Sequence, residues 1–134
     1  MIIPRNTIIA IADGEKLNLF RNTGTDQELS LTAVPADDMD SDVKSGSTGR
    51  EGSSANPDGG QAEEDGFAKG VVELLNQRVL DGKVSNVVVI AAPRTLGEMR
   101  KHYHKKLSDV LLGEIAKDLT GHSVADVEKT LAAA

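Results

Sequence analysis

Gly59-Gly60-Gln61 is the first segment whose residue types could take part in chemistry. Glycine lets the backbone approach a ligand closely and adopt unusual dihedral angles, and the glutamine amide offers both a hydrogen-bond donor and an acceptor. The candidate catalytic residues are therefore Gln61 with Gly59 and Gly60. The acidic residues at 63–65 follow directly and would repel phosphate groups.

The second segment is the main concentration of basic residues, between positions 94 and 106. Its cations could contact RNA phosphates, and its tyrosine could stack on a base. The alternative interpretation is a solvated helix end, where positive charge also interacts favourably with the helix dipole. The candidate binding residues are Arg94, Arg100, Lys101, Tyr103, Lys105 and Lys106.

The sequence predicts no metal site, no cofactor site and no complete catalytic set. His102 and His104 are two residues apart and do not share a helix face, whereas paired zinc-binding histidines on a helix are typically four apart. The chain has no cysteine, which excludes disulfides, thiolate ligands and a cysteine nucleophile. Its glycine-rich stretch lacks the lysine and the serine or threonine of a phosphate-binding loop.

Composition indicates one domain over residues 1–134, with a thin aliphatic core that leaves room for a homo-oligomer. The net charge of −6 disfavours broad binding to a phosphate backbone, but it allows a local basic patch. The first residues do not follow a signal-peptide pattern, and no apolar run is long enough to span a membrane. We therefore expect a cytoplasmic protein.

The first third of the chain predicts an antiparallel meander of strands at 7–12, 17–21 and 28–34. The first is a β-branched apolar run, and the third alternates between apolar and polar residues. Asp13-Gly14 predicts a two-residue hairpin turn with positive φ, and Asp13 and Lys16 are expected to serve that turn. Residues 22–24 predict the second turn.

Residues 36–66 change in character, since they are acidic, rich in glycine and serine, and almost free of apolar side chains. Such a segment cannot bury enough surface to offset the entropy of ordering it. We expect a flexible insertion.

The rest of the chain predicts helices around one buried strand. An amphipathic helix starts at Phe67 and ends at Asp81-Gly82, where glycine suits a left-handed cap. The apolar run 86–92 predicts a strand in the middle of a sheet covered on both faces. Thr95 and Glu98 form a capping-box pattern for the next helix.

Two further segments complete the pattern. Residues 110–115 fit either a strand or a helix that Ser108 could cap. Ser123 and Asp126 form another capping-box pattern, which predicts a short final helix. The elements together predict an α/β fold, in which a mixed sheet starts with the antiparallel meander and carries helices packed on it.

Several blocks of the chain resemble one bacterial family. The blocks are Ala12 to Lys16, Phe67 to Lys69, Val87 to Arg100 and Glu114 to His122. They resemble the family of proteins required for attachment to host cells, which is similar to the middle domain of archaeal and eukaryotic peptide-chain release factors. The resemblance implies a ribonuclease-H-like mixed sheet, in which residues 110–115 form a strand.

The resemblance also frames the function. Release factors carry a Gly-Gly-Gln tripeptide on a loop that leads into a helix, where it helps to position the water that cleaves peptidyl-tRNA, and residues 59–61 are placed similarly. Flanking basic residues are missing here, and the chain has no room for a codon-reading domain. Our leading hypothesis is a non-enzymatic binding protein of the host-attachment family with an unknown partner. The alternatives are a translation-associated factor that binds the ribosome, tRNA or another structured RNA, and a structural or oligomeric module.

Overall fold

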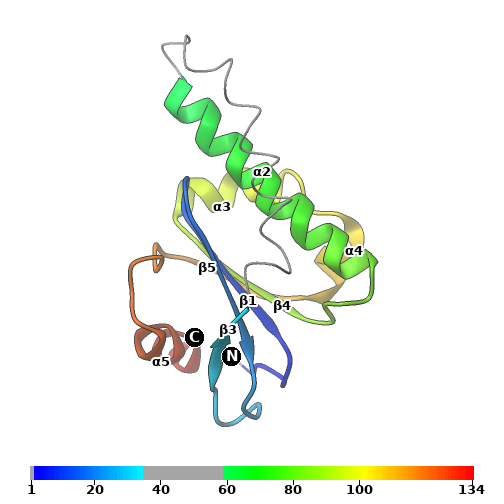
Figure 1. Cartoon of the computed structure of the whole chain (residues 1–134), viewed down its shortest axis with the longest axis vertical. Helices are drawn as coiled ribbons and strands as arrows, with labels where there is room; N and C mark the ends of the chain where they lie inside the picture. Colours follow the sequence, from blue (N-terminus) through cyan, green and yellow to red (C-terminus); the bar gives the residue numbers. More distant parts are fainter. Residues whose placement is uncertain (1, 35–58) are drawn as a thin grey trace.

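A computed structural model describes residues 2–34 and 59–134 of the chain, and for residues 59–62 it describes the backbone alone. Within these ranges the chain forms a five-stranded sheet with four helices (Figure 1). The strands are β1 (Ile8–Ala12), β2 (Leu17–Asn22), β3 (Leu31–Ala33), β4 (Val87–Ala91) and β5 (Leu111–Ala116). The helices are α2 (Gly59–Leu80), α3 (Pro93–Arg100), α4 (Lys105–Val110) and α5 (Val124–Ala133).

The sheet has the strand order β3-β2-β1-β4-β5. β1, β2 and β3 pair in antiparallel fashion, which confirms the predicted meander. β4 pairs in parallel with β1 on one side and with β5 on the other. The predicted α/β class with a mixed sheet is therefore confirmed.

β1 and β4 form the centre of the sheet, and every residue of both strands is buried. In a strand that is covered on both faces, all side chains lie in the interior. Both strands are accordingly continuous apolar runs. The prediction that residues 86–92 hold a central strand is thus confirmed. Alternation along β1 sends Ile8 and Ala10 toward one face and Ile9 and Ile11 toward the other.

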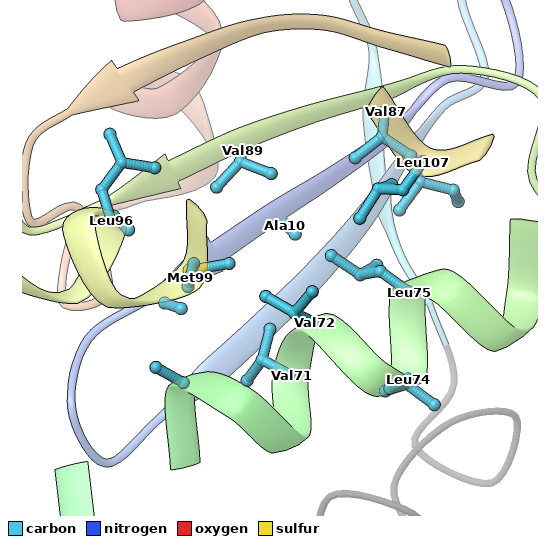
Figure 2. Packing of buried hydrophobic residues seen from close by; sticks show 14 of the residues in the cluster. Ala10, Val71, Val72, Leu74, Leu75, Val87, Val89, Leu96, Met99 and Leu107 are labelled. Carbon is cyan, nitrogen blue, oxygen red and sulfur yellow. The ribbon is translucent and has the colours of Figure 1, made fainter. Parts of the chain in front are cut away.

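Helices α2, α3 and α4 cover the first face of the sheet (Figure 2). Consecutive turns of α2 present an apolar stripe toward the short side chain of Ala10, as expected for an amphipathic helix. The buried contributors to this layer include Val71, Val72, Leu74 and Leu75 of α2, Leu96 and Met99 of α3, and Leu107 of α4.

Helix α5 and the N-terminal segment cover the second face of the sheet. Val127 and Leu131 of α5 and Ile3 pack with Ile11 of β1 and Ile90 of β4. α5 also supplies a hydrogen-bond acceptor at the edge of the sheet. The Glu128 carboxylate accepts a hydrogen bond of 2.8 Å from the backbone N–H of Leu31 in β3.

Helix α2 is longer than predicted. It begins at Gly59 instead of Phe67, so residues 59–66 of the predicted flexible insertion are helical. Residues 36–58 of that insertion lie outside the described residues. The predicted glycine cap is confirmed, because Gly82 has a φ of 77°. Its N–H donates to the Val79 carbonyl and that of Lys83 to the Arg78 carbonyl, the paired bonds of a Schellman motif.

The turn after β1 differs from the predicted two-residue hairpin. It contains the four residues 13–16, since Ala12 pairs with Leu17, and Gly14 does not have a positive φ. The Asp13 Oδ1 atom accepts hydrogen bonds from the backbone N–H groups of Glu15 at 2.7 Å and Lys16 at 2.6 Å. This side-chain-to-backbone turn replaces the type I′ turn that the Asp-Gly pair favours.

The third strand is shorter than the predicted range 28–34. The buried Asn22 side chain accepts hydrogen bonds at its Oδ1 from the N–H groups of Gly24 at 3.0 Å and Ser30 at 3.1 Å. Because Asn22 takes the Ser30 N–H, regular pairing begins only at Leu31. Ala33 is exposed although it has the same place in the strand's alternation as the buried Leu31.

The predicted helix starts are right at α5 and wrong at α3. The capping box of Thr95 and Glu98 is wrong, because α3 begins earlier, with Ala92 as its N-cap and no side-chain cap. Pro93 sits in its first turn, where a missing N–H removes no helical hydrogen bond. The cap at Ser123 is confirmed, since its hydroxyl accepts from the Asp126 N–H at 3.2 Å.

The ambiguous segment is divided between the two alternatives. Residues 105–110 form α4, so that Ser108 lies inside a helix instead of capping one, and residues 111–116 form β5. The strand implied by the resemblance is therefore confirmed.

Replacing Leu75 by alanine tests the packing of α2 on the sheet. Leu75 is fully buried, so Leu75→Ala should lower the free energy of unfolding by about 2–5 kcal/mol, measured by urea denaturation. Leu80→Ala is the matched control in the same helix, because Leu80 is 52% exposed; its effect should stay within about 0.5 kcal/mol. Equal effects of the two substitutions would contradict the described packing.

Candidate functional site

The predicted basic segment runs from the first turn of α3 through the following turn to the start of α4. Asn76 of α2 holds this turn: its Nδ2 atom donates to the His102 carbonyl at 3.0 Å, and its Oδ1 atom accepts from the His104 N–H at 3.0 Å. His104 then caps α4, because its Nδ1 atom accepts from the Lys106 N–H at 3.0 Å. The segment is fixed to the core by contacts that its charge pattern did not predict.

Arg100 and Tyr103 both bind Glu114 of β5. The Arg100 Nη2 atom lies 3.1 Å from Glu114 Oε1, and the Tyr103 hydroxyl donates to Oε2 at 2.7 Å. Burial, together with the hydrogen bond to Glu114 and its negative charge, raises the pKa of Tyr103 well above its ordinary value. Tyr103 also packs against the first core layer and is partly buried, so its role in base stacking stays a prediction.

Lys101 and His102 both bind Glu98. The Lys101 Nζ and His102 Nε2 atoms each lie 3.0 Å from a Glu98 carboxylate oxygen. Hydrogen bonds from Lys101 and His102 lower the pKa of Glu98, and the hydrogen bond to Glu98 raises the pKa of Lys101. Glu98 therefore binds both side chains, while the Lys101 side chain stays 69% exposed.

The other predicted binding residues have no side-chain partner among the described residues. The side chains of Arg94, Lys105 and Lys106 are exposed and make no hydrogen bond or salt bridge within residues 2–34 and 59–134. The structure also separates them, because Arg94 lies in the first turn of α3 and the two lysines lie in the first turn of α4. It therefore does not gather the six predicted residues into one site.

Gly59-Gly60-Gln61 forms the first residues of α2, and not a loop that precedes the helix. Figure 1 shows this end of α2 extending past the sheet and past α3. The tripeptide therefore lies at the end of α2 that projects past the sheet.

Asp13 links two segments that lie far apart in the sequence, a contact that sequence reasoning missed. The Thr120 hydroxyl lies 3.0 Å from Asp13 Oδ2 and 2.8 Å from Asp118 Oδ1, and it can donate its one proton to either carboxylate. The Asn18 Nδ2 atom adds a bond of 3.0 Å to the Thr120 carbonyl. Asp13 and Thr120 each belong to a sequence block on which the family resemblance rests. Their spacing along the chain, however, could not show that the two side chains are in contact.

The electrostatics of Asp13 reflect these contacts. Burial would raise the pKa of Asp13, but hydrogen bonds from the N–H groups of Glu15 and Lys16 and from the Thr120 hydroxyl outweigh it, as does the Lys16 charge. The pKa of Asp13 is therefore below its ordinary value.

Helix α2 contacts the same turn. A Cβ atom added to Gly14 would lie 2.5 Å from Cγ and 2.7 Å from Cδ of Glu64. A side chain at this position would therefore have to displace the Glu64 side chain, whereas the backbone angle of Gly14 sets no such demand. This contact places the N-terminal part of α2 against the turn after β1.

The described residues offer no metal centre: within 2–34 and 59–134, no group of three or more His, Cys, Asp or Glu side chains could hold a metal ion. His102 binds Glu98, His104 caps α4, and His122 lies 3.6 Å from Asp126 on α5. None of the helices in the described part of the chain is long and apolar enough to cross a membrane.

Comparison with known proteins identifies a family. The model of a family described as bacterial archaeo-eukaryotic release factor family 12 matches residues 6–131. Comparisons with curated proteins and with solved structures find no significant match.

Substituting Asp13 tests the contact between the turn and the segment after β5. Asp13→Asn should lower the free energy of unfolding by about 1 kcal/mol near neutral pH. Because the pKa of Asp13 is lower in the folded state, its contribution exists above the ordinary value of 3.8 and is lost as the pH falls through the folded value. Urea denaturation over an acid pH series should show that the free energies of unfolding of the two proteins converge as the pH falls. A difference that stays constant with pH would show that the charge of Asp13 does not contribute to stability.

Proposed function

The chain belongs to the bacterial archaeo-eukaryotic release factor family 12, and from this premise we propose that it is a translation-associated protein that binds the ribosome or a tRNA. The observation that carries the proposal is the match over residues 6–131, which includes all five described strands and the Gly-Gly-Gln segment. Binding to the translation machinery would also make it a cytoplasmic protein.

The geometry of α2 supports the proposal. A helix end that projects past the sheet can reach into a recess that the body of the protein cannot enter (Figure 1). Two consecutive glycines at that end let the backbone approach a partner closely. A glutamine beside them can donate and accept hydrogen bonds at a nucleotide or a water.

The charge of the protein limits the kind of binding. A net charge of −6 opposes general attraction to RNA, so binding must rest on a local surface whose cations face the phosphates. The proposal therefore implies a contact that is specific in place and sensitive to salt.

A second candidate function is hydrolysis of peptidyl-tRNA, which the presence of a Gly-Gly-Gln tripeptide at the projecting end of α2 favours, although the tripeptide is helical here and does not lie in a loop. A reaction here would depend on positioning water at the ester. Attachment to host cells rests on the sequence resemblance alone and stays a prediction. Cell fractionation that finds only cytosolic protein would exclude a direct adhesin.

Binding to ribosomes is tested by co-sedimentation. The full-length protein should pellet with purified ribosomes in low salt and should dissociate as the salt concentration rises, because phosphate contacts release counterions. Free tRNA added as a competitor distinguishes the two RNA partners. Absence of the protein from the ribosome pellet, together with no binding to tRNA, would contradict the proposed function.

The role of Gln61 is tested by peptide release from ribosomes that carry peptidyl-tRNA. If the protein is a hydrolase, Gln61→Ala should slow release by roughly 100-fold, because the water loses its positioning group. Gln77→Ala is the matched control, since Gln77 lies in the same helix and bonds only Asp81 through its amide at 2.9 Å. Equal rates in all three proteins would remove Gln61 from the chemistry.

A further inference from the structure

The two edges of the sheet differ in how they are protected. A sheet edge carries unpaired backbone N–H and C=O groups that can pair with a strand of another chain. The β3 edge is three residues long, and the Glu128 carboxylate of α5 already accepts a hydrogen bond from the Leu31 N–H there. The β5 edge is six residues long, and in the described sheet it pairs with β4 alone. β5 is therefore the more open of the two edges.

The composition of β5 does little to prevent pairing with another chain. Lysine and proline commonly block an edge strand, and β5 contains neither of them. A charged side chain can also protect an edge, but Glu114 is bound within the chain to Arg100 at 3.1 Å and to Tyr103 at 2.7 Å. Apart from the pairing with β4, the described residues give the backbone of residues 112–116 no hydrogen-bond partner.

Leu112 is the exposed large apolar residue of this edge. The register between β4 and β5 shifts between Val87 and Val88, so that Leu112 is an extra residue in a bulge, and regular pairing resumes at Gly113. Bulges often protect an edge by twisting it away from other chains. This bulge instead presents a leucine that is 38% exposed, and covering its side chain in an interface would be favourable.

The charges at the two ends of β5 fit an antiparallel pair of β5 strands. Asp109 precedes β5 in the last turn of α4, and Lys117 directly follows β5. Both side chains are exposed, and neither has a partner among the described residues. When two copies of one strand pair in antiparallel fashion, the start of each strand lies beside the end of the other. Lys117 of each copy would then lie near Asp109 of the other copy, whereas a parallel pair would bring like charges together.

Asp118 is the next charged residue after Lys117. Its carboxylate already accepts a hydrogen bond from the Thr120 N–H at 3.2 Å, and the Thr120 hydroxyl lies 2.8 Å from the same oxygen. Lys117 is therefore the charged side chain at this end of β5 that has no described bond.

We infer that the β5 edge joins two copies of this chain, and that antiparallel β5–β5 pairing makes one continuous sheet from two five-stranded sheets. Backbone hydrogen bonds supply the attraction, as in other cases of strand addition. Leu112 of both copies becomes covered, and two pairs of Asp109 and Lys117 favour the antiparallel direction. A two-fold dimer needs the same surface on both copies, which a single edge strand provides. The inference does not depend on the proposed function.

The oligomeric state of the full-length protein tests the inference. Sedimentation equilibrium should show a reversible equilibrium between monomer and dimer, with a dissociation constant on the order of micromolar, because an edge pair buries a small area. Leu112→Lys places a cation on the edge and should weaken the dimer by at least about tenfold. Val124→Lys is the matched control and should leave the dissociation constant unchanged. Val124 is 39% exposed and lies one helical turn from Glu128, which binds the opposite edge of the sheet.

Exchanging the charges at the ends of β5 tests the antiparallel direction. Asp109→Lys and Lys117→Asp should each weaken the dimer by about fivefold, because each brings like charges together and the two-fold axis repeats the effect. The two substitutions together restore opposite charges, and the dissociation constant should return to that of the parent protein. Urea denaturation of every variant checks that the fold is retained.

A protein that stays monomeric at every concentration would overturn the inference. A dimer that Leu112→Lys leaves intact would also overturn it, because such a dimer uses another surface. If the charge exchange fails to restore a dimer that each single substitution weakens, the antiparallel arrangement is wrong. A monomer that loses binding to purified ribosomes through Leu112→Lys would assign the β5 edge to a strand of another protein, which equally contradicts the inference.

Discussion

The parallel pairing of β1 with β4 is the interaction on which the rest of the structure depends. Ile8 to Ala12 pair in register with Val87 to Ala91, and all ten residues are buried between two apolar layers. Each layer supplies the burial that such a strand pair needs, since α2, α3 and α4 cover one face and α5 covers the other. The core is aliphatic, so its stability rests on many small contacts instead of a few aromatic ones.

The same pairing decides where function can be placed. Neighbouring parallel strands end at the same edge of the sheet, and β5, which pairs in parallel with β4, ends there too. The turn after β1, the start of α3 and the segment after β5 therefore meet, although Asp13 and Thr120 are 107 residues apart. Contacts from Asn18 and Glu64 add β2 and α2 to the same end. The sheet thus gathers short sequence blocks that have no contact along the chain.

The sequence was sufficient to predict those elements that are determined by residues within the element or directly beside it. The apolar run at Val87–Ala91 predicted a central strand, and Gly82 and Ser123 predicted a helix end and a helix start, because each residue acts on its own backbone. It failed where a distant or competing contact decides the outcome. Asn22 shortened the third strand, Glu98 binds Lys101 and His102 instead of capping α3, and Glu114 occupies Arg100 and Tyr103. A run of basic residues could not reveal that carboxylates from α3 and β5 bind part of it.

Hydrogen–deuterium exchange of the whole protein, alone and with ribosomes, tests both the central strand pair and the proposed function. The amides of β1 and β4 should exchange most slowly in both states, because they lie between both layers. Ribosomes should add protection only at surface segments outside this pair. Fast exchange in β4 would contradict the central pairing, and unchanged exchange of every amide in the presence of ribosomes would contradict ribosome binding.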